Sequence, residues 1–168
     1  MTVSELNRAG REDFTDAVGF AFENSPWIAR AAWENRPFAS VDDLHAAMVA
    51  VVEQAPEEKR IELIAAHPDL AGRVAREGRL TAASRDEQSS AGLDRLSKEE
   101  LARFERLNQA YRARFSFPFV ICARENTKDS ILSALESRAQ NDRAAEIVAS
   151  LREIAKIAHL RLSDAVED

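Results

Sequence analysis

Apolar side chains recur at helical spacing along most of this chain, and that periodicity constrains the fold more than any other feature. Residues three and four positions apart share one face of a helix, so such a stripe predicts a helix with one buried side. Five glycines and five prolines among 168 residues also disfavour a turn-rich β fold. A clear early stripe consists of Phe14, Ala17, Val18, Ala21 and Phe22. We therefore predict an all-α fold, a multi-helix bundle forming a single domain over residues 1–168.

Helix starts can be predicted from residues that cap the first turn. Ser25, which precedes Pro26, and Ser40 are suited to the cap position. Two Ser-x-x-Glu sequences, at residues 84–87 and 97–100, match the capping box, in which each side chain bonds the other residue's backbone N–H. We expect a helix to begin at each of these four serines.

Two segments lack clean helical periodicity. Residues 67–83 contain two glycines and predict a loop with one short helix. The apolar run Phe117–Ala123 contains Pro118, which disfavours a central strand, so it predicts a buried extended segment or the start of a short helix. Two further helices are expected over residues 128–139 and 142–164.

Composition excludes several classes of function. The 23 Lys and Arg residues against 29 Asp and Glu give a net charge of −6, which disfavours nucleic acid as a partner. No apolar run approaches the roughly 20 residues that span a bilayer, and the N-terminus lacks a signal-peptide core, so we expect a cytoplasmic protein without membrane contact. One cysteine excludes an intrachain disulfide framework. The three histidines form no metal-binding pair on one helix, and no phosphate-binding glycine motif occurs, so neither a metal nor a nucleotide is predicted.

Three polar side chains each allow a structural and a functional interpretation. His67 can interact with a helix C-terminus, or it can transfer protons at the edge of a pocket, where a near-neutral pKa is useful. Glu87 can close the capping box with Ser84, or the start of that helix can bind a ligand. Arg161, at the edge of an apolar face, can extend its charged head into water or grip a carboxylate or ureido group. Cys122 lies in an apolar run without a basic neighbour, so it is most simply a buried hydrophobe.

Five sequence blocks together resemble a known family, the 2-oxo-4-hydroxy-4-carboxy-5-ureidoimidazoline (OHCU) decarboxylases, which make (S)-allantoin in urate breakdown. They contain Arg-Pro-Phe, His-Pro-Asp-Leu-Ala-Gly, Ser-x-x-Glu-Gln, Phe-x-Phe-Pro-Phe and Ile-Ala-x-x-Arg-Leu, in this order. The blocks lie at residues 36–38, 67–72, 84–93, 107–119 and 157–162. The resemblance covers the chain from about residue 10 to 164.

The resemblance implies an all-α homodimer that decarboxylates OHCU with neither metal nor organic cofactor. It implies that His67 is the catalytic proton-transfer residue, with Glu87 beside it. The implied contacts to OHCU and its product allantoin are Pro68, Ser84, Arg85, Asp86, Glu87, Gln88, Phe119, Val120, Ile121, Cys122, Ala123 and Arg161.

Two positions depart from the family pattern, and two alternative functions stay open. Ser116 stands where the family usually has glycine, and Ala139 where leucine is more usual. A substituted glycine can alter the backbone angles of its loop. The alternatives are a non-catalytic helical module that binds a ligand or partner, and an enzyme acting on a related ureido-imidazoline. The chain ends in Val-Glu-Asp and not in the Ser-Lys-Leu of peroxisomal members, which favours a bacterial-type cytosolic enzyme.

Overall fold

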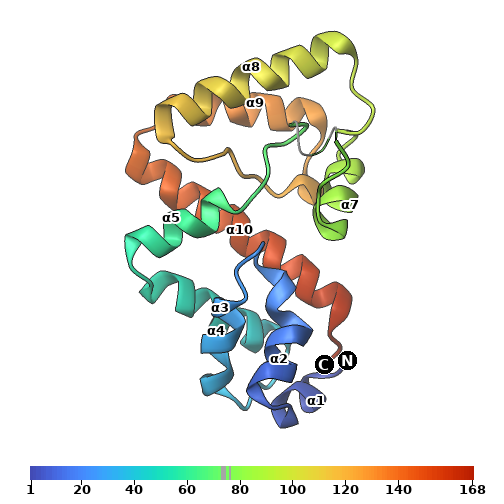
Figure 1. The fold of residues 1–168 in the computed structure, drawn as a ribbon, viewed down its shortest axis with the longest axis vertical. Helices are drawn as coiled ribbons and strands as arrows, with labels where there is room; N and C mark the ends of the chain where they lie inside the picture. Colours follow the sequence, from blue (N-terminus) through green and yellow to red (C-terminus); the bar gives the residue numbers. More distant parts are fainter. Residues whose placement is uncertain (73–74, 76) are drawn as a thin grey trace. The chain divides into compact units, whose positions relative to one another are not determined.

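The structure is a computed structural model that describes residues 1–72, 75 and 77–168, and within these residues every regular element is a helix (Figure 1). The all-α prediction is therefore confirmed. The short helix expected within residues 67–83 falls partly on residues 73, 74 and 76, which lie outside the described residues. Among the described helices, none is both long and apolar enough to cross a membrane. The chain divides into two compact units, Met1–Ala66 with Ala155–Asp168, and His67–Ile154.

The first unit is built from short helices, among which α2 packs on α3 and α3 packs on α4. Residues 155–165 of α10 (Arg143–Ala165) belong to this unit. Its other elements are α1 (Val3–Arg8), α2 (Arg11–Val18), η1 (Gly19–Ala21), α3 (Trp27–Ala32), η2 (Trp33–Asn35), α4 (Val41–Gln54) and α5 (Glu57–Ala65). Near the chain ends, Thr2 and Glu167 form an isolated parallel bridge.

The local signals for helix starts in this unit were partly right. The Ser40 hydroxyl accepts a hydrogen bond from the Asp43 N–H at 3.1 Å, so its predicted cap is confirmed. The Ser25 cap is wrong, because α3 begins at Trp27 after Pro26 and has no side-chain cap. The Ser25 N–H instead bonds the Phe22 carbonyl at 3.1 Å within the turn before α3. The predicted stripe does form the core: Phe14, Val18, Ala21 and Phe22 are buried.

The second unit contains the 18-residue helix α8 (Lys98–Phe115), which packs along α9 (Lys128–Arg138) (Figure 1). It also contains α7 (Ala82–Ser90), η3 (Ala123–Glu125) and residues 143–154 of α10. The capping box at residues 97–100 is confirmed at the start of α8. The two helices expected over residues 128–139 and 142–164 correspond to α9 and α10.

Aromatic rings fill the centre of the second unit. Tyr111 lies 4.6 Å from Phe115 and 5.3 Å from Phe119, measured between ring centroids. Phe117 stacks on Phe115 at 5.9 Å. These rings anchor the chain after α8, where residues 117–122 run without regular structure and are buried before η3 begins. The prediction that this segment is buried is therefore confirmed, and the short helix η3 begins at its last residue, Ala123.

Candidate active site

His67 follows the C-terminal end of α5 and is only 6% exposed. The helix ends at Ala65, as expected from the proline after His67, because a residue that precedes proline avoids helical geometry. The Nε2 atom of His67 is buried. The imidazole is therefore not a solvent-exposed cap at a helix end, and its role as the catalytic residue stays a prediction.

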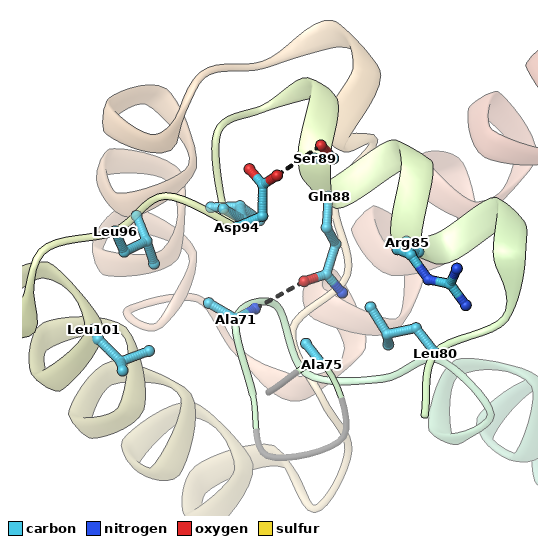
Figure 2. A pocket seen from close by; sticks show the side chains of 10 residues that line it. Ala71, Ala75, Leu80, Arg85, Gln88, Ser89, Asp94, Leu96 and Leu101 are labelled. Carbon is cyan, nitrogen blue, oxygen red and sulfur yellow. Dashed lines mark hydrogen bonds between the residues drawn. The ribbon is translucent and has the colours of Figure 1, made fainter. Parts of the chain in front are cut away.

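The loop after His67 is tied to two helices by three hydrogen bonds. Arg112 of α8 donates to the Asp69 carboxylate at 2.9 Å, and Asn108 of α8 donates to the Leu70 carbonyl at 2.9 Å. The Ala71 N–H donates to Oε1 of Gln88 on α7 at 3.0 Å (Figure 2). The bonds to Leu70 and Ala71 hold the backbone that follows His67, and the bond to Asp69 holds a side chain of the same loop. A held backbone limits the positions that the His67 side chain can take.

Gly72 lets this loop turn tightly. A Cβ atom at this position would lie 2.7 Å from the Cβ of Asp69, closer than real Cβ atoms come. The Gly72 N–H donates a hydrogen bond to the Asp69 carbonyl at 3.3 Å. The glycine is therefore required for the turn that directs Asp69 and Ala71 to their partners.

Helix α7 presents one face of the predicted segment at residues 84–88 inward. It starts one turn earlier than predicted, because the Thr81 hydroxyl accepts from the Ser84 N–H at 3.2 Å and caps the helix. The capping box between Ser84 and Glu87 is therefore wrong, and the capping interpretation of Glu87 is wrong with it. Ser84 and Gln88 are buried and Glu87 is half-buried, whereas Arg85 and Asp86 are exposed.

The segment Phe119–Ala123 is buried throughout, and polar side chains hold its backbone. Arg138 donates to the Val120 carbonyl at 2.7 Å, and the Cys122 N–H donates to the Glu153 carboxylate at 2.9 Å. The guanidinium of Arg138 also lies 4.5 Å above the Phe119 ring. Sequence patterns did not single out Arg138 or Glu153, because their partners are backbone groups distant in the chain.

Cys122 reports the electrostatics of this segment. Burial raises the pKa of its thiol, and the negative charges of Glu125, Glu153 and Glu87 raise that pKa further. The thiol therefore stays protonated at neutral pH, which agrees with the interpretation of Cys122 as a buried hydrophobe and not a nucleophile. Glu87 thus acts electrostatically on this segment, and α7 packs against η3, so the structure brings α7 and this segment together.

Arg161 lies on the part of α10 that belongs to the first unit, whereas the other predicted site residues belong to the second unit. Its side chain is 4% exposed, so the interpretation of a charged head in water is wrong. Nη1 of Arg161 lies 2.8 Å from Oε2 of Glu23, whose side chain is 3% exposed, and 3.3 Å from the Phe20 carbonyl oxygen. The sequence patterns did not single out Glu23. The one feature that could have indicated it is the position of its carboxylate directly after the apolar run at residues 20–22.

A cavity of about 330 Å³ lies in the second unit beside α7 (Figure 2). Two residues of the predicted segment, Arg85 and Gln88, line it. The amide oxygen of Gln88 is turned to Ala71, and the Ser89 hydroxyl donates to Asp94 at 2.9 Å (Figure 2). The remaining lining residues are Ala71, Ala75, Leu80, Ser89, Leu93, Asp94, Leu96 and Leu101. His67 and Glu87 are not among the described residues that line this cavity, so it does not bring the two predicted catalytic groups together.

The part of the chain that the structure describes contains no group of three His, Cys, Asp or Glu side chains that could hold a metal ion. The other two histidines lie in the first unit and contact each other edge-to-face at 5.0 Å. His159 bonds Asp42 at 2.8 Å, and His45 bonds the Ala155 carbonyl at 2.8 Å. These contacts fit the interpretation of His45 and His159 as ordinary helix side chains.

Comparison with known proteins identifies the family. The family model of OHCU decarboxylase matches residues 7–163. The chain is 43% identical over 164 residues to the 2-oxo-4-hydroxy-4-carboxy-5-ureidoimidazoline decarboxylase of Haloferax volcanii, covering 98% of this chain and 95% of that protein. It is 42% identical to the protein of the same name from Halalkalicoccus jeotgali, covering 98% of this chain and 91% of the relative.

A solved structure extends the likeness to three dimensions. The crystal structure of an (S)-allantoin synthase superposes with a TM-score of 0.80 at 29% sequence identity, covering 99% of this chain and 54% of that one. The protein is therefore an all-α lyase, in which hydrogen bonds anchor the loop that follows His67. The chain belongs to the OHCU decarboxylase family.

Proposed function

We propose that this protein decarboxylates OHCU to (S)-allantoin as a carboxy-lyase of urate degradation. The observation that carries the proposal is the family match over residues 7–163, together with relatives of that name at 42% and 43% identity over nearly the whole chain. Buried His67, followed by a loop with three side-chain anchors, supplies a positioned group for the chemistry.

The substrate supplies its own electron sink. Its ring carbon that carries the hydroxyl and the carboxylate adjoins a C=N bond. When the bond to the carboxylate breaks, its electron pair forms a C=C bond in the ring and displaces the C=N pair onto nitrogen, and CO₂ leaves. The nitrogen and the adjacent ring carbon each take a proton, while the hydroxyl loses one as it becomes a carbonyl. Decarboxylation therefore consumes one proton overall.

The protein's task is to hold the ring and to manage these protons. Protonation of the ring carbon from one face gives a single allantoin enantiomer, so the acid must be fixed in position. We assign this proton transfer to His67, because an imidazole both accepts and donates protons near neutral pH. Glu87, whose carboxylate is half-buried on the inward face of α7, tunes the charge around the reacting groups.

Substrate contacts are proposed for Pro68, for the segment at residues 84–88, for Phe119–Ala123 and for Arg161. Among residues 84–88, the inward positions Ser84, Glu87 and Gln88 are the stronger candidates, since Arg85 and Asp86 are exposed. The buried segment Phe119–Ala123 offers an apolar wall, and an apolar surrounding favours loss of a carboxylate charge as CO₂.

Circular dichroism tests the activity directly. OHCU is generated in the cuvette from urate with uricase and hydroxyisourate hydrolase, with and without this protein. Rapid growth of the (S)-allantoin signal, ahead of the slow spontaneous racemic decay, supports the proposal. A folded, helical protein that leaves the signal unchanged rejects it in favour of a binding module or an enzyme with a related substrate.

The same assay tests His67. His67→Asn is expected to lower the rate of (S)-allantoin formation about 10²- to 10⁴-fold, the usual contribution of a proton-transfer residue. His159→Asn, the same substitution at a half-exposed histidine of the first unit, is the matched control and should retain the wild-type rate. Wild-type turnover by a folded His67→Asn protein would reject the assignment.

We also propose that the whole chain acts as one domain and that the protein is a cytoplasmic homodimer. The family match across both compact units supports the first point. The dimer and the compartment follow from the family resemblance. Light scattering after size-exclusion chromatography tests the dimer, since a mass near 18.7 kDa at all concentrations would exclude it.

A further inference from the structure

The buried pair between Arg161 and Glu23 determines what kind of group Arg161 can bind. Both side chains are almost fully buried, and Nη1 of Arg161 is shared between the Glu23 carboxylate and the Phe20 carbonyl oxygen. Two acceptors on one nitrogen fix the plane of a guanidinium, because its N–H groups lie in a rigid fork.

Glu23 lies in a short turn, which constrains the backbone from which its carboxylate reaches Arg161. The turn follows η1 and precedes α3, and the Ser25 N–H closes it by bonding the Phe22 carbonyl at 3.1 Å. Asn24, the residue directly after Glu23, has a φ of 46°, in the left-handed region that asparagine tolerates better than most residues. Phe22 and Ser25 on either side of Glu23 and Asn24 are buried.

The charge of Glu23 balances the charge of Arg161 within a site that excludes water. A buried guanidinium without an anion beside it would attract a carboxylate strongly, since charges interact more strongly in a low dielectric. With Glu23 at 2.8 Å, the pair is neutral overall and keeps its directional N–H donors. Such a pair favours a neutral carbonyl acceptor over a carboxylate.

This preference suits a decarboxylase. An unbalanced cation on the substrate carboxylate would stabilise the bound ground state and disfavour the loss of that charge as CO₂. Only interactions that are stronger in the transition state accelerate the reaction. A neutral carbonyl of the ring or ureido arm keeps its position while the carboxylate leaves.

We propose that Glu23 is a positioning residue that orients and charge-balances Arg161, so that Arg161 binds a neutral ureido or amide carbonyl and not the substrate carboxylate. This inference rests on the proposed function, which makes Arg161 a substrate contact. It assigns Glu23 a role in ligand selection that a merely structural ion pair would not have.

The test compares two probes that differ in charge: allantoin, which is neutral, and allantoate, its ring-opened carboxylate. Calorimetry gives the Kd of each probe for the wild type, Glu23→Gln, Glu23→Asp and Arg161→Gln. Glu23→Gln is expected to shift the preference from allantoin toward allantoate by about tenfold or more, the scale on which a buried charge pair responds to loss of one partner. Glu23→Asp keeps the charge and should keep the wild-type preference.

A ratio of two Kd values is insensitive to partial unfolding, because an unfolded fraction raises the apparent Kd of both probes by the same factor. Glu12→Gln is the matched control: Glu12 pairs with Arg30 in the same unit, but its side chain is 70% exposed, and its loss should leave the preference unchanged. With OHCU, Glu23→Gln should lower kcat while KM stays constant or falls. This pattern distinguishes an over-stabilised ground state from lost binding.

The outcomes separate the inference from the function beneath it. If Arg161→Gln weakens allantoin binding but Glu23→Gln leaves the preference as in Glu12→Gln, the role of Glu23 is overturned and the proposed function stands. If Arg161→Gln changes neither Kd in an active enzyme, the substrate contact at Arg161 is wrong and the inference falls with it. If Glu23→Gln shifts the preference equally in the Arg161→Gln background, Glu23 does not act through Arg161, which also overturns the inference.

Discussion

Each unit of the molecule buries an arginine against a glutamate, but the two pairs have different surroundings. In the second unit Arg138 pairs with Glu146, whose side chain is fully buried, and Glu146 also accepts hydrogen bonds from Tyr111 and Asn141. Arg138 then donates to the Val120 carbonyl. In the first unit Arg161 pairs with Glu23 and also donates to the Phe20 carbonyl, beside a turn.

The difference teaches that the same ion pair can serve two purposes. The Arg138–Glu146 pair directs its arginine to a backbone carbonyl in Phe119–Ala123, so its effect is to hold a wall of the candidate site. The Arg161–Glu23 pair holds an arginine for which a ligand contact is proposed. Breaking the Arg138–Glu146 pair should therefore mainly lower the stability of the protein. Breaking the Arg161–Glu23 pair should mainly change its ligand preference.

The largest expected effect comes from breaking the pair in the second unit. Glu146→Gln should lower the free energy of unfolding by about 3–5 kcal/mol, because it leaves Arg138, whose side chain is only 14% exposed, without its charged partner. Urea denaturation measures this. Glu136→Gln is the control, since Glu136 pairs with Arg103 at the surface and should cost less than about 1 kcal/mol. Equal losses of unfolding free energy in the two variants would contradict a stabilising role of the Arg138–Glu146 pair.

A smaller effect is expected at one backbone position with positive φ in each unit, Ser116 in the second and Asn24 in the first. Ser116 ends α8 with a φ of 64° and precedes the buried run that leads into Phe119–Ala123. Ser116, where the family resemblance leads us to expect glycine, therefore adopts left-handed geometry. Ser116→Gly should raise the free energy of unfolding by about 0.5–1 kcal/mol, as glycine adopts this region without steric cost.

The matching position in the first unit is Asn24, which follows Glu23 and has a φ of 46°. Because asparagine already tolerates this region, Asn24→Gly should change stability by less than about 0.5 kcal/mol. Thermal unfolding of both variants checks the contrast. A destabilised Ser116→Gly protein would show that contacts of the serine side chain outweigh its backbone strain.

The smallest expected effect is a pH dependence of stability that comes from His45 in the first unit. Burial lowers the pKa of His45 in the first unit, and the neighbouring His159 lowers it further, against the Ala155 carbonyl and Asp42, which raise it. Between this lowered pKa and the unfolded value near 6.5, the unfolded chain binds more protons, so stability falls as the pH is lowered through that window. Unfolding free energies from pH 7.5 to 5 should show this slope, and His45→Gln should flatten it. An unchanged slope in His45→Gln would place the titration elsewhere.

Local rules predicted those parts of the fold whose cause is local. The caps at Ser40 and Ser97 depend on a bond to a residue three positions away, and both were predicted. The cap at Ser84 failed because Thr81, three residues earlier, is an equally good cap, and starting the helix there buries Ser84 on its inward face. Sequence spacing cannot choose between two such starts when tertiary packing decides.

The membership of the candidate site is a prediction from the family resemblance, and the structure adds the surroundings of each predicted residue. The family resemblance indicated His67, Glu87 and Arg161 from the sequence alone. It did not indicate Glu23 or Arg138, because a buried ion pair between distant segments leaves no periodic signal in the sequence. Nor did it show that Arg85 and Asp86 are exposed, which follows from where α7 begins.

Cys122 gives the molecule an intrinsic reporter for opening of the site wall. It is the only thiol in the chain, it is 1% exposed, and its raised pKa keeps it in the unreactive form. A thiol reagent can therefore react only when Phe119–Ala123 transiently separates from its partners. The rate of chemical labelling then measures the free energy of that local opening without any introduced probe.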